Sequence, residues 1–348
     1  MKIAVIGVGL MGGSVALAAR ERAGAHVTGF DPAGIAVPGV VDRVAETPAD
    51  AVADADVVVV AAPVAALPDA VGAALAASEG IVTDVGSTKR ALVEAIGDPR
   101  FIGGHPLAGA ETAGAEHARA DLFEGATWYL TPTPATEGVL YDRLYRLLVE
   151  FGARPQALDP DTHDTLMAAV SHLPHVLANV LVAQAARALD AEGERLPATG
   201  PSFRDATRVA GAPTAIWRDI YLANADALGS VLDDTIARLQ RVRAALGDRD
   251  GDSIAAWNEH AGVERRRLLD AHLTGADAVR LRVSVPNRPG VVAEVALALG
   301  RGSVNIVDMA LHPAADNASG VIEVWVSAGQ AAVAQGLIED LKLPVAVE

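Results

Sequence analysis

The spacing of hydrophobic positions divides the chain of 348 residues into three stretches. In residues 1–157, short runs rich in β-branched residues alternate with alanine-rich stretches of helical period. This alternation is typical of βαβ units on a parallel sheet. The predicted strands cover residues 2–6, 26–30, 57–61, 81–84, 101–103 and 128–131. We therefore expect an α/β domain of the Rossmann type, with a doubly wound sheet.

The second stretch, residues 158–276, has the period of amphipathic helices and almost no strand pattern. Glycine and proline interrupt the helical period near 197–202, 211–213 and 247–251. We expect an all-α middle domain. Its apolar surface exceeds what the first domain alone would cover, so we also expect a homodimer built on these helices.

In the third stretch, residues 277–348, strand and helix patterns follow each other in the order βαββαβ. The strands are expected at 279–285, 304–311 and 320–327, with a helix at 291–299 and a final helix and strand after 327. This order is typical of a small ferredoxin-like α+β module.

Composition excludes several classes of protein. A hydrophobic share of 51% argues against wholesale disorder, and no apolar run reaches the length that crosses a bilayer. The formal charge of −16 is unsuited to a general binder of nucleic acid or anionic membranes. The absence of cysteine rules out disulfides and thiolate sites, and no spacing of His, Asp or Glu suggests a metal. Without a signal peptide pattern at the start, we expect a cytoplasmic protein.

A glycine-rich motif follows the first predicted strand and opens a helix: Gly7-Val8-Gly9-Leu10-Met11-Gly12. In such a motif the first glycine permits a tight turn, the second lets the backbone approach a pyrophosphate, and the third lets helix and strand pack closely. Asp31 ends the second strand, where a carboxylate binds the adenosine ribose hydroxyls and repels a 2′-phosphate. We therefore predict NAD as the cofactor. The alternative for Asp31 is a turn residue before Pro32.

Two further loops carry candidate catalytic residues. Ser87 follows the strand at 81–84, and His105 follows the strand at 101–103. Ligands of a doubly wound sheet bind beyond the carboxyl ends of its strands, which places both residues beside the nicotinamide. A histidine there can accept a hydroxyl proton as hydride leaves the same carbon. Ser87 could bind His105 or the substrate, or it could cap a helix beginning near Thr88.

The helical domain carries a second group of polar residues. Asp164, Ala168, Ser171 and His175 recur at helical spacing and share one face, which either lines a site or faces solvent, whereas His172 lies off that face. Arg204 and Arg208 lie one turn apart. One of them could bind a substrate carboxylate through two hydrogen bonds, or both could join Asp205 in a surface network.

Together these stretches resemble the prephenate dehydrogenase family. The matching segments occur in family order over about residues 1–270: Gly7-Val8-Gly9-Leu10-Met11-Gly12-Gly13-Ser14, Asp84-Val85-Gly86-Ser87-Thr88-Lys89, Gly104-His105-Pro106-Leu107-Ala108-Gly109, Ser171-His172-Leu173-Pro174-His175, Phe203-Arg204-Asp205-Ala206-Thr207-Arg208 and Trp217-Arg218-Asp219-Ile220.

The resemblance implies NAD-dependent oxidative decarboxylation of prephenate to 4-hydroxyphenylpyruvate, in tyrosine biosynthesis. It implies that His105 is the base for the ring hydroxyl and that Ser87 supports this contact. Arg208 matches the arginine that binds a substrate carboxylate. The remaining implied pocket residues are Asp164, His175, Trp217 and, at the pocket entrance, Glu111.

The third stretch resembles an ACT domain, a module that binds amino acids and regulates biosynthetic enzymes. The resemblance rests on the turn around Asn287, Pro289 and Gly290 and on Asn305. Asn287 replaces the acid that is usual in this turn. The resemblance implies tyrosine as an effector, and the alternative is a purely structural or dimerising module.

Three other functions remain to be separated from this one. Arogenate dehydrogenase acts on a substrate that differs only by an amino group in place of the side-chain keto group. β-Hydroxyacid dehydrogenases use a lysine in the helical domain, but no lysine lies between Lys89 and Lys342. A catalytically inactive amino-acid or nucleotide sensor would not need His105, Ser87 and Arg208.

Overall fold

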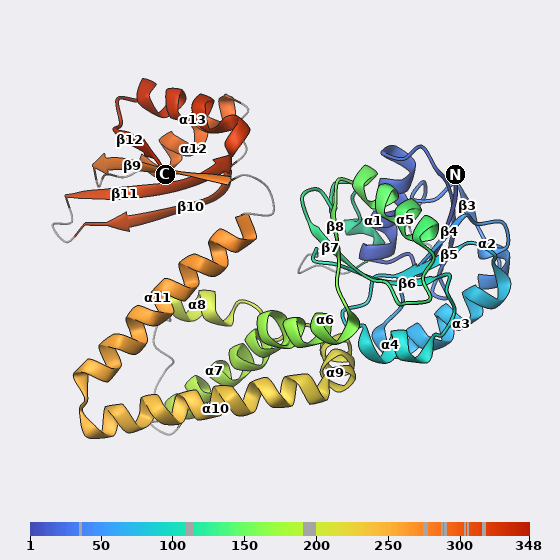
Figure 1. Ribbon diagram of the computed structural model, residues 1–348, viewed down its shortest axis with the longest axis horizontal. Helices are drawn as coiled ribbons and strands as arrows, with labels where there is room; N and C mark the ends of the chain where they lie inside the picture. The colour runs from blue at the N-terminus through green and yellow to red at the C-terminus, as the bar shows by residue number, and fades with distance from the viewer. Residues whose placement is uncertain are drawn as a thin grey trace. The chain divides into compact units, whose positions relative to one another are not determined.

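The computed structural model describes residues 1–34, 37–108, 114–190, 200–273, 278–286, 288, 291–302, 304, 306–314 and 318–348 (Figure 1). These residues form two compact units, Met1–Arg238 and Leu239–Glu348. The predicted domain limit near residue 157 falls where the last strand of the first sheet ends and the long helices begin. The division into three domains stays a prediction.

The first unit is built on an eight-stranded sheet in the order β3-β2-β1-β4-β5-β6-β7-β8. The first six strands in this order have the doubly wound arrangement, so the predicted Rossmann-type domain is confirmed. The strands are β1 (Lys2–Ile6), β2 (His26–Phe30), β3 (Arg43–Val44), β4 (Val57–Val60), β5 (Ile81–Asp84), β6 (Phe101–Pro106), β7 (Thr127–Thr131) and β8 (Arg154–Ala157).

Strand β6 differs most from its prediction. It was expected to end at residue 103, but it continues to Pro106 because β7 pairs with it antiparallel, with His105 opposite Tyr129. His105 therefore lies within a strand and not in the following loop, and the expectation of a wholly parallel sheet is wrong at this pair. The short strands β3 and β8 were not predicted. Only two residues form β3, and β8 contains Pro155, so neither shows a clear alternating pattern.

Both faces of the sheet are covered by helices, as Figure 1 shows. In β1, Ile3 and Val5 join the core shared with α1 and α5, whereas Ala4 and Ile6 join the core shared with α2, α3 and α4. Adjacent residues of one strand are thus buried on opposite faces, which explains why β1 and β4 are continuously hydrophobic. The helices of this part are α1 (Leu10–Glu21), α2 (Pro48–Val52), η1 (Val64–Ala66), α3 (Leu67–Ala77), α4 (Arg90–Ala95), η2 (Ala115–His117) and α5 (Gly138–Glu150).

Helices follow the sheet, as predicted for the middle of the chain. They are α6 (Pro160–Met167), the π-helical segment η3 (Ala168–His172), α7 (Leu173–Asp190), α8 (Pro201–Thr207), α9 (Thr214–Ala223), α10 (Ala225–Asp248) and α11 (Gly251–Leu273). Within the first unit, α6 packs against α4, and α9 packs against η1 beyond the carboxyl end of β4. These two contacts bring the helical residues to the edge of the sheet where the glycine loop lies.

One continuous helical stretch, Pro160–Arg187, is long and apolar enough to cross a membrane by length and composition alone. The expectation that no such run exists is therefore wrong for this stretch. It also holds the fully buried polar side chains His163, Asp164 and His172, and a helix surrounded by lipid could not satisfy these groups alone. The stretch thus has the internal polar contacts of a packed protein domain.

The second unit contains a four-stranded sheet in the order β10-β11-β9-β12, with every neighbouring pair antiparallel. The predicted βαββαβ order is what the structure shows. Leu281, Val283 and Val285 alternate along β9 and enter one core with the two helices. The elements are β9 (Ala278–Pro286), α12 (Val291–Arg301), β10 (Ile306–Pro313), β11 (Ser319–Ser327), α13 (Ala328–Asp340) and β12 (Val345–Val347). The four predicted regulatory residues, Asn287, Pro289, Gly290 and Asn305, lie outside the described residues.

Candidate active site

The glycine loop between β1 and α1 has the geometry of a dinucleotide-binding turn. Gly7 has φ +89°, and a Cβ atom there would lie 2.5 Å from the carbonyl oxygen of Ala61. At Gly12 a Cβ atom would lie 1.8 Å from the carbonyl oxygen of Gly7, whereas at Gly9 it would meet nothing within 4 Å. Gly7 and Gly12 are thus required for close packing, and Gly9 leaves the backbone open to a ligand.

The start of α1 is suited to an anion. Gly9 is its N-cap and supplies no side-chain acceptor, and its first turn carries no acidic residue. Leu10 and Met11 are the first two residues of the helix and are partly exposed. Backbone N–H groups at such a helix end bind phosphate. The loop therefore fits the pyrophosphate of a dinucleotide.

Asp31 lies directly after β2 and faces the glycine loop. Its Oδ2 atom accepts a hydrogen bond from the Val8 N–H at 2.7 Å, and its Oδ1 atom accepts one from the Ala33 N–H at 2.8 Å. The carboxylate therefore both shapes the turn and lies where an adenosine ribose is bound in this fold. Asp31 can thus be both a turn residue before Pro32 and a partner of the ribose hydroxyl groups.

His105 begins a chain of three hydrogen-bonded side chains. Its Nδ1 atom lies 2.9 Å from Nε2 of His163, and Nδ1 of His163 lies 2.8 Å from Oδ1 of Asp164. His105 keeps some exposed surface, but His163 and Asp164 are fully buried. Burial of the ring, followed by the nearby basic groups of His163, Lys89 and His172, holds the pKa of His105 well below 6.5. His105 is therefore neutral at pH 7 and able to accept a proton.

Asp164 also caps helix α4 from outside that helix. Its Oδ1 and Oδ2 atoms accept hydrogen bonds from the N–H groups of Lys89, at 2.8 Å, and Arg90, at 3.0 Å. Burial opposes ionisation of this carboxyl group, but the hydrogen bonds from His163, Lys89 and Arg90 outweigh it and lower its pKa. The alternative that Asp164 faces solvent is wrong. Its contacts hold other residues in place.

Ser87 lies in the loop between β5 and α4 and is partly exposed. Helix α4 begins at Arg90, two residues after Thr88, and Asp164 supplies the acceptors that Ser87 would offer under the alternative that it caps this helix. Within the described part of the chain the Ser87 hydroxyl group has no hydrogen-bond partner, and its loop follows the strand next to β6.

A buried ion pair lies beneath the same loop. Lys89 and Asp84 are both fully buried, and the Lys89 ammonium contacts Oδ2 of Asp84. Asp84 also accepts hydrogen bonds from the N–H groups of Gly86, at 2.8 Å, and Gly104, at 3.0 Å. This pair joins the end of β5 to the residue before His105, so it fixes the backbone on which the histidine stands.

His172 is buried, although helical spacing placed it off the polar face. Because η3 is π-helical, each of its turns holds more residues than an α-turn, which rotates His172 toward the side of Asp164. Asn224 Nδ2 donates to the Asp164 carbonyl oxygen at 2.7 Å and lies 3.2 Å from Nδ1 of His172. Burial lowers the pKa of His172 to about 4, although the Asp164 carboxylate opposes this shift.

The other predicted pocket residues gather around Trp217 on α9. The rings of His175 and Trp217 stack with centroids 3.4 Å apart, and His172 meets the same indole edge-on at 6.2 Å. Burial, and then the positive charge of Arg208, lower the pKa of His175. The structure thus brings Arg208, His175 and Trp217 together, and their role as substrate-pocket residues stays a prediction. Glu111 lies outside the described residues.

Sequence reasoning missed His163, His172 and Asn224 as members of the site, and it assigned no role to the Lys89–Asp84 pair. The adjacent residues His163 and Asp164 occur near the start of the first helix after the sheet, a polar pair beside an apolar stretch. That pair was the available signal. No pattern in the sequence indicated Asn224, whose contacts are made only by folding.

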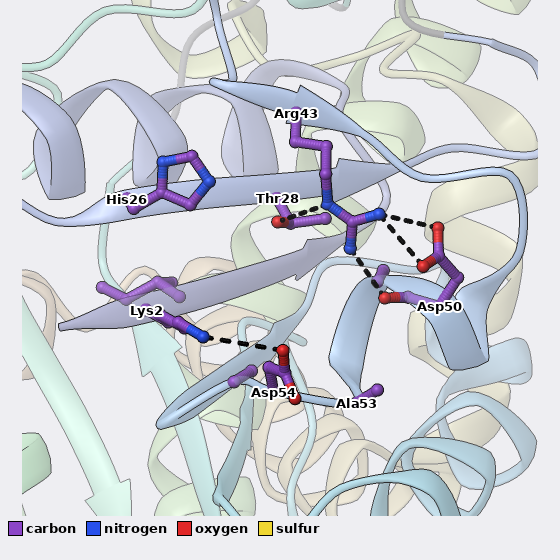
Figure 2. Close-up of a pocket in the computed structure, with 10 residues that line it drawn as sticks. Lys2, His26, Thr28, Arg43, Asp50, Ala53 and Asp54 are labelled. Atoms are coloured by element: carbon purple, nitrogen blue, oxygen red, sulfur yellow. Dashed lines mark hydrogen bonds and ion pairs between the residues drawn. The ribbon is translucent and has the colours of Figure 1, made fainter.

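A cavity of about 370 Å³ lies elsewhere, at the amino ends of β1 and β2 (Figure 2). Its charged residues already pair with each other: Lys2 contacts Asp54 at 3.5 Å, and Arg43 contacts Asp50 at 2.8 Å. Ligands of doubly wound sheets bind at the opposite, carboxyl edge. We therefore assign the functional site to the edge that carries the glycine loop and His105.

Comparisons with known proteins point to one family. The sequence profile of the prephenate dehydrogenase nucleotide-binding domain matches residues 15–156, beginning just after the glycine loop, and that of the prephenate dehydrogenase dimerization domain matches residues 159–259. The prephenate dehydrogenase of Bacillus subtilis is 31% identical over 340 residues, covering 92% of this chain and 91% of that protein.

Two further proteins extend the comparison. The cyclohexadienyl dehydrogenase of Zymomonas mobilis is 35% identical over 286 residues, covering 78% of this chain and 97% of that protein. The crystal structure of prephenate dehydrogenase from Aquifex aeolicus, in complex with hydroxyphenyl propionate and NAD⁺, superposes with a TM-score of 0.71 at 27% identity. It covers 77% of this chain and 98% of that chain.

Proposed function

The chain belongs to the prephenate dehydrogenase family, and on this premise we propose that it oxidises prephenate with NAD⁺ to 4-hydroxyphenylpyruvate and carbon dioxide. One observation carries the proposal. A neutral histidine, His105, is held by one ring nitrogen at the carboxyl edge of a sheet whose glycine loop fits a dinucleotide. Catalytic residues and cofactor of such an enzyme meet at this edge.

In this function His105 is the base. Its Nε2 atom accepts the proton of the substrate hydroxyl group as hydride leaves the carbon that bears this group. The resulting dienone loses carbon dioxide, and the aromatic phenolate that forms takes the proton back. NAD⁺, when bound, supplies the hydride acceptor. Because aromatisation drives the reaction, the protein mainly has to align two reactants and move one proton.

Binding of prephenate, which carries two carboxylates, requires a local positive charge in an acidic protein. Arg208 lies beside His175 and Trp217, and it is the proposed partner of a substrate carboxylate. Ser87, in the loop beside β6, is the proposed second contact of the substrate hydroxyl group. For the cofactor, the carboxylate of Asp31 favours NAD over NADP, because it would repel a 2′-phosphate.

For the C-terminal module we propose an ACT domain that responds to tyrosine. Its βαββαβ sheet supports this assignment. The match to the Bacillus subtilis protein covers 92% of this chain, more than residues 1–259 supply, so it extends into the module. The predicted cytoplasmic location stays a prediction.

We also propose that the protein is a homodimer. Helices α7, α10 and α11 each expose large apolar side chains, among them Leu181, Leu239 and Trp257. The matched domain profile is that of a dimerization domain, and its residues 159–259 include most of these helices. A second copy of the chain is the partner that would cover them.

One assay tests the enzymatic proposal. Reduction of NAD⁺ and of NADP⁺ is followed with prephenate and with arogenate, each with and without tyrosine. We expect turnover with prephenate and NAD⁺, inhibited by tyrosine. His105→Asn should lower kcat by about 10²- to 10⁴-fold, the range for loss of a general base, without loss of NAD⁺ binding.

The other outcomes are equally informative. Turnover with arogenate alone would replace the substrate but keep the reaction class. Absence of turnover with both substrates would contradict the enzyme proposal and favour the sensor. If His105→Asn lost NAD⁺ binding yet turned over normally once saturated, His105 would not be the base.

A further inference from the structure

The tautomeric state of His105 depends on the residues behind it. Two hydrogen bonds link three side chains in series. Nδ1 of His105 lies 2.9 Å from Nε2 of His163, and Nδ1 of His163 lies 2.8 Å from Oδ1 of Asp164. A neutral imidazole has one N–H donor and one acceptor nitrogen, so assigning one proton in such a series assigns the next. The series can therefore be solved from its buried end outward.

At the buried end, Asp164 can only accept. Its two oxygens already receive the N–H groups of Lys89 and Arg90, and these bonds, together with that from His163, lower the pKa of the carboxyl group despite its burial. An ionised carboxylate has no proton to donate. Nδ1 of His163 must therefore carry a proton and donate it to Asp164.

Between the two rings there is room for one proton. Nε2 of His163 and Nδ1 of His105 are 2.9 Å apart, and two N–H groups facing each other at this distance would repel. If His163 donated, it would be a cation with protons on both nitrogens, and a neutral His105 would carry its own proton on Nε2. If His105 donates, both rings are neutral and Nε2 of His105 has a free lone pair.

We propose that His163 is a positioning residue that holds the proton of His105 on Nδ1, so that Nε2 of His105 is free to take the substrate proton. This inference rests on the proposed role of His105 as the base. Among the described residues, no hydrogen-bond partner contacts Nε2 of His105. In the described part of the chain, the fold thus holds the His105 ring by Nδ1, the nitrogen that does not perform the chemistry.

The surroundings keep His163 in this orientation. His105 and Tyr129 are register partners on β6 and β7, and His163 meets both rings edge-on, at 5.1 and 5.7 Å between centroids. Such an edge-on arrangement suits an in-plane N–H···N bond better than stacking. Through its Nδ1 atom His163 contacts the Asp164 carboxylate, which accepts hydrogen bonds from the N–H groups of Lys89 and Arg90 at the start of α4.

The arrangement also serves the step after proton uptake. When Nε2 of His105 takes the hydroxyl proton, the ring gains one positive charge. The Nδ1–H bond directs this charge toward His163 and the Asp164 carboxylate, which lies two hydrogen bonds away. A buried carboxylate that lies behind a catalytic imidazole stabilises the imidazolium in the same sense.

The direct test is ¹⁵N NMR of the histidine rings in the full-length protein with NAD⁺ bound. The spectrum distinguishes a protonated from an unprotonated ring nitrogen, and His105→Asn identifies the His105 signals. We expect His105 and His163 both to be protonated on Nδ1. A proton on Nε2 of His105 in the wild-type protein would overturn the proposal, whatever substrate the enzyme uses.

Two substitutions of His163 separate the contacts on its two nitrogens. The amide of His163→Asn reaches the position of Nδ1, so it keeps the bond to Asp164 but loses the acceptor for His105. The amide of His163→Gln reaches the position of Nε2 and can offer its oxygen to His105. His26→Asn, at an exposed histidine on the opposite edge of the sheet, is the matched control.

We expect His163→Asn to move the His105 proton to Nε2 and to lower kcat by about 10²-fold or more, with the KM for prephenate and the affinity for NAD⁺ nearly unchanged. His163→Gln should restore the Nδ1 proton and most of kcat, and His26→Asn should change neither. An unchanged His105 tautomer in His163→Asn, or an Nε2 proton in His163→Gln, would contradict the proposal. The tautomer measurement does not need turnover, so its failure is distinct from failure of the proposed function.

Discussion

At the scale of single residues, the site depends on which nitrogen of each buried histidine carries a proton. Asn224 shows how strictly this is set at His172. One hydrogen of the Asn224 amide donates to the Asp164 carbonyl oxygen, which leaves the other to face Nδ1 of His172. Nδ1 of His172 must therefore accept, and a second proton on this ring would meet an N–H group. Neutral His172 is thus part of the folded state.

This requirement predicts a pH dependence of stability. The pKa of His172 is 6.5 in the unfolded chain and about 4 in the folded protein. As the pH falls from 6.5 to 4, only the unfolded chain takes up this proton, so the free energy of unfolding should fall by about 3 kcal/mol from this group and level off below pH 4. His172→Gln should reduce the slope of stability in this window by about 1.4 kcal/mol per pH unit, measured by urea unfolding. Above pH 6.5 the slopes of the two proteins should coincide, and equal slopes below it would show that His172 does not titrate in this way.

At the scale of elements, Asp164 connects helices α6 and α4. The hydrogen bond from the Lys89 N–H to Asp164 joins residues that are 75 positions apart in the sequence. Asp164 belongs to α6 but supplies the N-terminal acceptors of α4, which has no side-chain cap of its own. Helix α6 is capped separately by Asp159, whose carboxylate accepts the Thr162 N–H at 2.9 Å. These two aspartate caps differ: the cap by Asp159 is exposed and local, whereas the cap by Asp164 is buried and formed by folding.

The same substitution should affect the two caps differently. Asparagine is as good a local cap as aspartate, so Asp159→Asn should leave stability almost unchanged. In Asp164→Asn the new NH₂ group must face a donor, either the Arg90 N–H or the pair of donors at Oδ1, at a cost of about 2–3 kcal/mol. Thermal and urea unfolding of both variants measure the difference. Equal effects would mean that water replaces the acceptor at α4.

The elements also show where sequence reasoning succeeds and where it cannot. Strands β1, β2 and β5 were predicted to the residue because their runs of buried residues end at glycine, proline or charged positions. The end of β6 was not predictable, since it depends on pairing with β7 across the long connection between them. His105, Arg208 and Trp217 were predicted from residue type and motif. His163 and Asn224 were not, because their importance comes from contacts with distant residues.

At the scale of the whole molecule, apolar surface is concentrated on the helices that follow the sheet. Val180, Leu181, Ile236, Leu239 and Trp257 are all at least 40% exposed, although each is a residue type that is usually buried. Exposed apolar side chains that gather on helices in this way mark interaction sites. The proposed second copy of the chain would cover these side chains.

A charge on this surface should weaken the dimer. Leu239 on α10 is 58% exposed in the single chain, and Leu239→Asp would place a carboxylate in the proposed interface. We expect the dissociation constant to rise by about 10- to 100-fold, equal to roughly 1–3 kcal/mol, in sedimentation or light-scattering measurements. Val139→Asp, at a residue of α5 that is 78% exposed, is the control and should leave the dimer intact. A monomeric wild-type protein at micromolar concentration would contradict the dimer itself.

The π-helical turn at Ala168–His172 has a consequence for comparing this chain with its relatives. A π-turn accommodates one residue more than the α-helical turn it replaces. A relative whose helix is α-helical throughout this stretch would thus reach the same point in space one residue earlier. An ungapped alignment would then pair His172 with a residue on a different side of that relative's helix, and would carry its role to the wrong position. Placing the gap inside the turn, and not in the loop that follows α7, would keep chemically equivalent histidines in one column.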